Sequence, residues 1–178
     1  NPNISNRASL NLIKYWPNEF KKILINNLNI NNIQLRRKSV NSLGGYGEEI
    51  VLPIIEIFYS KNDTKTRISC LKVLVKVASN IDSKKFPSEI IGVINMALED
   101  YQPEIILTVI SLLRQLGSFG INFLKDCCRD ENLLKAKAAV SALNELNDPS
   151  LNLFFRDLLD DDSIDQFIRQ AASECLIV

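Results

Sequence analysis

The sequence predicts an all-α fold, a right-handed α-solenoid of about five to six stacked helix pairs. The first observation behind this prediction is a pattern in which a basic residue is followed by apolar residues three and six positions later. The pattern reads Arg7-x-x-Leu10-x-x-Ile13 and returns at Arg37 and Arg67, each time 30 residues further on. Residues at this spacing share one face of an α-helix. The second observation is that no segment shows the sustained apolar–polar alternation of a half-buried strand.

The basic position, which we call the anchor, recurs in the second half of the chain. Ile106, Lys137 and Arg169 follow at spacings of 39, 31 and 32 residues, so five of the six anchors are basic. Units of this length are typical of stacked helical repeats, in which each unit buries its apolar face against its neighbours. The residue three positions after an anchor is therefore expected to be buried. In the later five units these residues are Val40, Cys70, Val109, Val140 and Ala172.

The anchors themselves are expected to have a structural role. A basic side chain in the first turn of a helix opposes the helix dipole, so it does not favour the helix on its own. We expect it to pair with a carboxylate of the preceding turn, such as Asp63 before Arg67 or Asp165 before Arg169.

A second helical segment separates each pair of anchored helices. Pro17, Pro87 and Pro149 each open such a segment, at the helix position where a missing N–H has no cost. Pro53 lies inside another segment and predicts a late start or a kink there. Ser163 is the expected N-cap of the last helix. The five segments are residues 17–28, 48–59, 87–99, 119–129 and 149–159.

The composition excludes several classes of function. The chain has 178 residues, 46% of them hydrophobic, and it balances 21 basic against 21 acidic side chains. A chain of this length can bury a core without metal or disulfide support. It contains no histidine, which excludes serine–histidine triads, cysteine–histidine dyads and histidine metal sites. No cofactor is therefore expected.

The cysteines and the hydropathy indicate a cytoplasmic setting. Cys127 and Cys128 are adjacent, no CxxC pair occurs, and the four cysteines are expected to be reduced structural thiols. The longest nearly apolar stretch, residues 105–113, is about half of the ~20 residues that a membrane span needs. No membrane span is expected.

Two stretches carry a resemblance to a known family. Residues 36–44 and 168–172, together with the acid four positions before a basic anchor, resemble the short bacterial HEAT-like repeats of phycobiliprotein lyases and many scaffold proteins. The resemblance implies a HEAT/armadillo-like architecture in which the anchored helices line a concave face. Ile106 departs from the pattern because it replaces the basic anchor.

We expect a single repeat domain over residues 1–178. The chain ends in an apolar half-repeat at residues 171–178, which predicts a fragment of a longer protein. Charge is unevenly divided along the chain. Residues 1–89 contain 14 basic and 7 acidic side chains, and residues 90–178 contain 7 basic and 14 acidic ones.

The leading functional hypothesis is a non-catalytic scaffold, not an enzyme, that binds a protein or peptide on its concave face. Leu71 and Ile110 would form an exposed apolar strip in adjacent units, unless neighbouring helices bury them. The expected partner-binding residues are Lys38, Asn41, Leu71, Lys72, Lys76, Ile110 and Arg114, with Ser141 and Glu145 in later units.

Two alternatives remain open. The family resemblance implies a subunit of a chromophore (bilin) lyase, in which Cys127 or Cys128 beside Lys125 would be the nucleophile. A nucleic-acid-binding module would use the basic N-terminal half, with Tyr15 and Trp16 for base stacking. The zero net charge and the 7% aromatic content weigh against nucleic acid.

Overall fold

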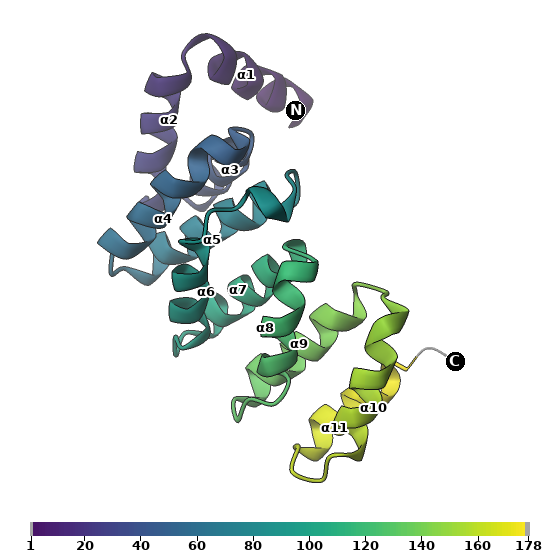
Figure 1. The fold of residues 1–178 in the computed structure, drawn as a ribbon. Coiled ribbons are helices and arrows are strands. Elements are labelled where there is room, and N and C mark those ends of the chain that lie inside the picture. Colours follow the sequence, from purple (N-terminus) through teal and green to yellow (C-terminus); the bar gives the residue numbers. More distant parts are fainter. Residues whose placement is uncertain (1, 177–178) are drawn as a thin grey trace. The chain divides into compact units, whose positions relative to one another are not determined.

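The computed structural model describes residues 2–176, which form eleven α-helices and no strand (Figure 1). This confirms the predicted all-α class. The helices are α1 (Pro2–Tyr15), α2 (Pro17–Asn26), α3 (Ile33–Gly44), α4 (Val51–Ser60), α5 (Thr64–Ala78), α6 (Ile90–Leu98), α7 (Pro103–Gln115), α8 (Ser118–Cys127), α9 (Leu133–Asn144), α10 (Asn152–Asp160) and α11 (Gln166–Glu174).

The odd-numbered helices carry the six anchors, and the even-numbered helices occupy the five segments between them. Cys70, Val109, Val140 and Ala172 are buried, as the repeat pattern predicts. Val40 differs, because it is half-buried and lines an open groove described below.

Local sequence explains how two of the helices begin. α4 starts at Val51 after a 3-10 turn at Gly47–Ile50, which places Pro53 in its first turn and gives the late start expected there. The prediction that Ser163 is the N-cap of the last helix is wrong. Asp165 caps α11 by accepting a hydrogen bond of 2.8 Å from the Phe167 N–H, while Ser163 donates to Asp161 in the preceding turn.

The chain divides into two compact units, Asn1–Thr108 and Val109–Val178. In the first unit α1 packs on α2 and α3, α3 packs on α5, and α4 packs on α5 and α6. In the second unit α8 packs on α9, and α11 packs on both α9 and α10. The single domain over residues 1–178 and the right-handed solenoid therefore stay predictions.

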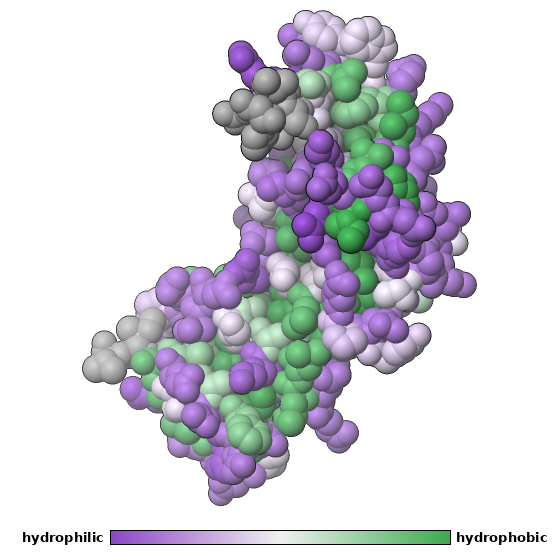
Figure 2. All heavy atoms as spheres, turned by 180° about the vertical axis from the view of Figure 1, so that it is seen from behind, coloured by the Kyte–Doolittle hydropathy of each residue, from purple (hydrophilic) through white to green (hydrophobic). Residues whose placement is uncertain are grey.

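Aliphatic side chains form the core of each unit. Leu43, Ile54 and Leu74 are fully buried in the first unit, and Leu124 and Leu158 are fully buried in the second. On the face that Figure 2 shows, the hydrophobic side chains that remain visible form narrow bands between hydrophilic ones.

The anchor of α5 does not pair as expected. Asp63 instead caps α5 by accepting a hydrogen bond of 2.8 Å from the Thr66 N–H. Arg67 reaches 33 residues along the chain and donates to Asp100 at 3.0 Å, and both side chains are largely buried. Its guanidinium also lies 4.6 Å from the centre of the Phe58 ring. The anchor therefore ties one helix pair to the next.

Replacing this arginine by alanine is expected to destabilise the protein. Arg67→Ala leaves the Asp100 carboxylate buried without its partner, a loss of about 3 kcal/mol in the free energy of unfolding. Arg67→Met keeps the apolar stem in contact with Phe58, so its loss in the free energy of unfolding should be smaller. Urea unfolding monitored by circular dichroism measures both, with Lys22→Ala on the exposed surface of α2 as the control. A loss below about 1 kcal/mol for Arg67→Ala would contradict this role of the anchor.

Candidate functional site

A hollow of ligand-sized volume lies between two anchored helices of the first unit. We call it the α3–α5 groove, and its volume is about 750 Å³. Gly44 allows the two helices to approach closely at one end, because a Cβ there would overlap the Lys76 side-chain stem. The groove is lined by Ile33, Arg36, Arg37, Val40, Asn41, Thr64, Lys65, Ile68, Ser69, Lys72, Val75, Lys76 and Glu104.

The lining of the groove combines apolar walls with an excess of positive charge. Aliphatic side chains come from both helices, and five cations face a single carboxylate, Glu104. The cations are Arg36, Arg37, Lys65, Lys72 and Lys76. Such a site favours an anionic ligand that also has an apolar body.

Three of these cations already have partners. Arg36 donates a hydrogen bond of 2.5 Å to the Ile30 carbonyl, and Lys65 donates to the Asn31 side chain at 2.6 Å. Lys72 pairs with Glu104 at 2.6 Å.

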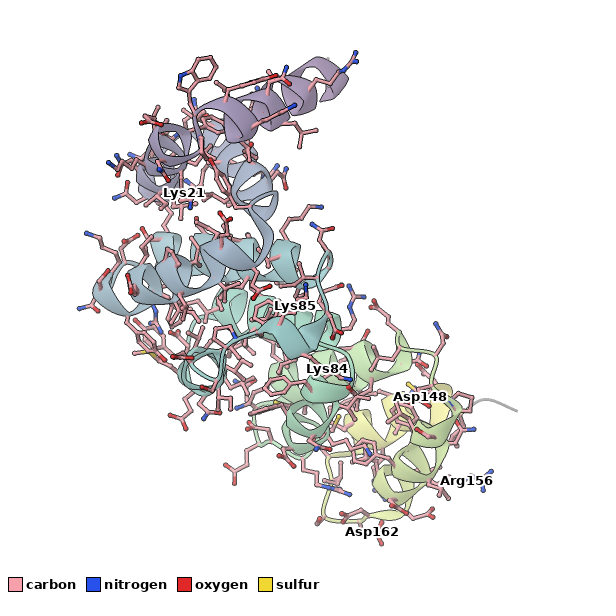
Figure 3. The ribbon with its side chains drawn as sticks, turned by 45° about the horizontal axis from the view of Figure 1, so that its top comes forward. Lys21, Lys84, Lys85, Asp148, Arg156 and Asp162 are labelled. Atoms are coloured by element: carbon pink, nitrogen blue, oxygen red, sulfur yellow. The ribbon has the colours of Figure 1, made fainter. Side chains whose placement is uncertain are left out.

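Two cations remain available in the groove. Arg37 and Lys76 form no ion pair with any side chain that the structure describes. Elsewhere in the unit, Lys21 pairs with Glu49 and Lys85 pairs with Glu48, at 3.8 and 3.9 Å (both lysines are labelled in Figure 3). Arg37 and Lys76 therefore place unpaired positive charge in the groove.

The helices that carry this face contain no acidic residue. Together α1, α3 and α5 include nine basic residues and neither aspartate nor glutamate. The second unit is different, since an acidic turn precedes α11 and Asp162 in it accepts a hydrogen bond from Arg169 (Figure 3). The unequal division of charge along the sequence thus becomes a cationic helix face in the first unit.

A smaller hollow shares two lining residues with the first one. We call it the α1–α3 groove, and its volume is about 390 Å³. The hydroxyl of Ser42 donates to that of Ser9 at 3.1 Å and joins the two helices beneath it. Asn41 and Lys76 line both grooves. The other lining residues are Ser9, Leu10, Ile13, Lys38, Ser42 and Gly45.

The structure brings together four of the predicted partner-binding residues. Asn41, Lys72 and Lys76 line the α3–α5 groove, and Lys38 lines the α1–α3 groove. Their role in binding a partner stays a prediction. Arg114 instead forms an ion pair with Glu145 of α9 in the second unit, where Ser141 is exposed.

The prediction that Leu71 and Ile110 form an exposed apolar strip is wrong. Leu71 is 0% exposed and Ile110 is 3% exposed, so neither side chain can meet a partner. Because α5 packs against both α3 and α4, nine of its residues are buried, including the position four residues after the anchor. Three of the five cations that line the groove, Arg36, Arg37 and Lys65, are not among the expected partner-binding residues, although the sequence shows the basic run at residues 36–38.

The cysteines are poor nucleophiles. All four are buried and free. Burial raises the pKa of the Cys127 thiol to about 11 and raises that of Cys128 further. Lys125 lies over the Phe154 ring at 5.2 Å. Burial of both thiols therefore disfavours the hypothesis that Cys127 or Cys128 attacks a chromophore.

Thiol labelling checks this conclusion. The native protein at pH 8 is expected to react with a thiol reagent roughly a hundredfold more slowly than the protein unfolded in urea. Four thiols should react after unfolding. Ser141→Cys places a thiol at an exposed position of α9 and is the control for fast reaction. Rapid labelling of the unchanged native chain would contradict the burial of its thiols.

Neither a metal centre nor a membrane helix is found in the described part of the chain. No cluster of three or more potential metal ligands occurs among those residues. None of the helices within residues 2–176 is both long enough and apolar enough to cross a bilayer.

The described residues form a helical protein with two grooves on a cationic face. No protein-family model matches the sequence. The chain is 26% identical over 143 residues to the bilin biosynthesis protein CpeZ of Synechococcus sp. (strain WH8020), which covers 75% of each chain. It is 21% identical over 177 residues to the uncharacterized phycocyanin operon protein Z of Pseudanabaena tenuis (strain PCC 7409), which covers 99% of this chain and 88% of that protein.

These similarities correct the leading hypothesis. The expectation of a non-catalytic scaffold that is not an enzyme is contradicted, because a relative that matches three quarters of the chain is named for bilin biosynthesis. The similarity favours the lyase alternative instead.

Proposed function

We propose that the chain takes part in bilin biosynthesis as a subunit of a chromophore lyase, and that it binds the bilin in the α3–α5 groove. The observation that carries the proposal is the groove itself, with its apolar walls and two unpaired cations. The similarity to a bilin biosynthesis protein supports the choice of ligand.

The chemistry of a bilin matches the lining of the groove. Bilins are open-chain tetrapyrroles with a flat, largely apolar conjugated body and two propionate side chains. The aliphatic side chains of Val40, Ile68 and Val75 would contact the body. Arg37 and Lys76 would bind the propionates through charge-assisted hydrogen bonds. The volume of about 750 Å³ lies within the range of about 300–1,000 Å³ that is usual for small-molecule sites.

The chain's role in attachment would be to bind and orient the chromophore. In thioether attachment a thiol adds across a carbon–carbon double bond of the bilin. A sulfur–carbon bond forms, the thiol proton goes to the neighbouring carbon, and no oxidant is needed. Because the four cysteines of this chain are buried, the thiol comes from an acceptor protein. The groove would hold the bilin in one orientation while that thiol approaches.

Titration with biliverdin tests the proposal. The absorption spectrum of biliverdin should change in a saturable manner with one site per chain. Biliverdin dimethyl ester keeps the conjugated body but lacks both carboxylates, so it should bind at least about tenfold more weakly. Equal affinity for the acid and the ester, or no saturable binding, would contradict the proposal.

A further inference from the structure

We propose that the α1–α3 groove docks an acidic and aliphatic segment of the protein that accepts the chromophore. This inference rests on the proposed function, because it places the acceptor beside the bilin. The observations that support it concern the α1–α3 groove, whereas the proposed function depends on the α3–α5 groove.

The charge of the α1–α3 groove is complementary to that of an acidic segment. Lys38 and Lys76 line the groove, no carboxylate lines it, and neither lysine forms an ion pair with a side chain that the structure describes. The two helices that build the groove contain five basic residues and no acidic one. A carboxylate of a partner could pair with Lys38 or Lys76 without breaking an existing ion pair, which favours binding.

The α1–α3 groove shares lining residues with the bilin groove. Asn41 and Lys76 line both hollows, so a molecule in the α3–α5 groove lies next to the α1–α3 groove. The attaching thiol belongs to another protein, since the thiols of this chain are buried. That protein must therefore contact the chain at the border of the bilin groove.

The lining of the α1–α3 groove favours a protein over a nucleic acid. Apolar contact in the α1–α3 groove comes from the aliphatic residues Leu10 and Ile13, and Leu10 is 61% exposed. Single-stranded nucleic acid is usually bound by stacking on aromatic side chains. Tyr15 and Trp16 are exposed but contact each other, with ring centres 6.1 Å apart, and line neither groove. A protein segment with an aliphatic side chain beside an acidic one therefore fits the groove better than a nucleic acid does.

The experiment measures binding of the full chain to a phycocyanin subunit that lacks its chromophore. Lys38→Glu is expected to slow association about tenfold at low salt and to reduce its salt dependence. Leu10→Asp is expected to raise the dissociation rate about tenfold, because an exposed apolar contact is lost. Matched controls are Lys22→Glu on α2 and Leu153→Asp, whose parent side chain is 71% exposed on α10. Circular dichroism verifies that each variant is folded.

The same variants are titrated with biliverdin, which separates the two proposals. Unchanged biliverdin affinity together with weaker subunit binding supports docking in the α1–α3 groove. A wild-type chain that binds biliverdin but not the subunit overturns it, and so does subunit binding that neither change affects. A wild-type chain that binds the subunit but no biliverdin refutes the proposed function alone. Binding of a 20-nucleotide DNA single strand that competes with the subunit and is lost in Lys38→Glu would overturn the inference in favour of nucleic acid.

Discussion

Reversing the two free cations of the α3–α5 groove, with Arg37→Glu and Lys76→Glu in one chain, is expected to weaken biliverdin binding at least about a hundredfold. A hydrogen bond to a charged group contributes about 1.5–3 kcal/mol, and two of them are removed here. Each 1.4 kcal/mol corresponds to about a tenfold change in the dissociation constant. The new carboxylates also repel the propionates of biliverdin, which weakens binding further. Absorption titration measures the dissociation constants.

The control makes the same change of charge outside the grooves. Lys22→Glu with Lys61→Glu alters two exposed lysines of the first unit that line neither hollow. Its biliverdin affinity should stay within about threefold of the wild type at 0.15 M salt, where distant surface charges are screened. An equal loss in both double variants would show that net charge, rather than the groove, governs binding.

Replacing one glycine of the second unit is expected to have a large effect on stability. Gly120 lies in α8 against the backbone of α7, and a Cβ there would overlap the Leu113 carbonyl oxygen and come within 2.6 Å of its carbon. Backbone atoms cannot rotate away as a side chain can, so the helices must separate. Gly120→Ala should lower the free energy of unfolding by about 3 kcal/mol and the midpoint of thermal unfolding by about 8 °C. Thermal unfolding followed by circular dichroism measures this shift.

A second glycine provides the matched comparison. Gly92 lies in α6, and an added Cβ would meet the hydroxyl end of Tyr59, a side chain that is 47% exposed and can move into solvent. Alanine is a better helix former than glycine by about 1 kcal/mol. Gly92→Ala should therefore leave stability unchanged or raise it slightly. Similar losses for both variants would contradict the close approach of the α7 and α8 backbones.

The sequence was sufficient to predict the positions of the helices. The anchors recur at a nearly constant interval, and each of the six falls in an odd-numbered helix. The partner of Arg67 could not be predicted in the same way. Asp63 is close in sequence but is engaged by the backbone of its own helix, whereas Asp100 becomes a neighbour only through packing of successive helix pairs.

The candidate site was predicted in part. Lys72 and Lys76 are four residues apart and therefore share one face of a helix, so their presence in one groove follows from periodicity. The burial of Leu71 could not be read from the same periodicity. Which side of a helix is covered depends on which elements pack against it, and α5 is packed against α3, α4 and the 3-10 turn Asn27–Asn29. The pairing of Lys72 with Glu104 likewise requires the tertiary structure.

The central claim is that a bilin binds between α3 and α5. Amide chemical shifts of the isotopically labelled chain, followed during a titration with biliverdin, test it most directly. Saturable shifts are expected in α3 and α5, at residues near Arg37 and Lys76, with the amides of α8 to α10 unchanged. Shifts that are confined to the second unit, or that are absent at saturating biliverdin, would contradict it.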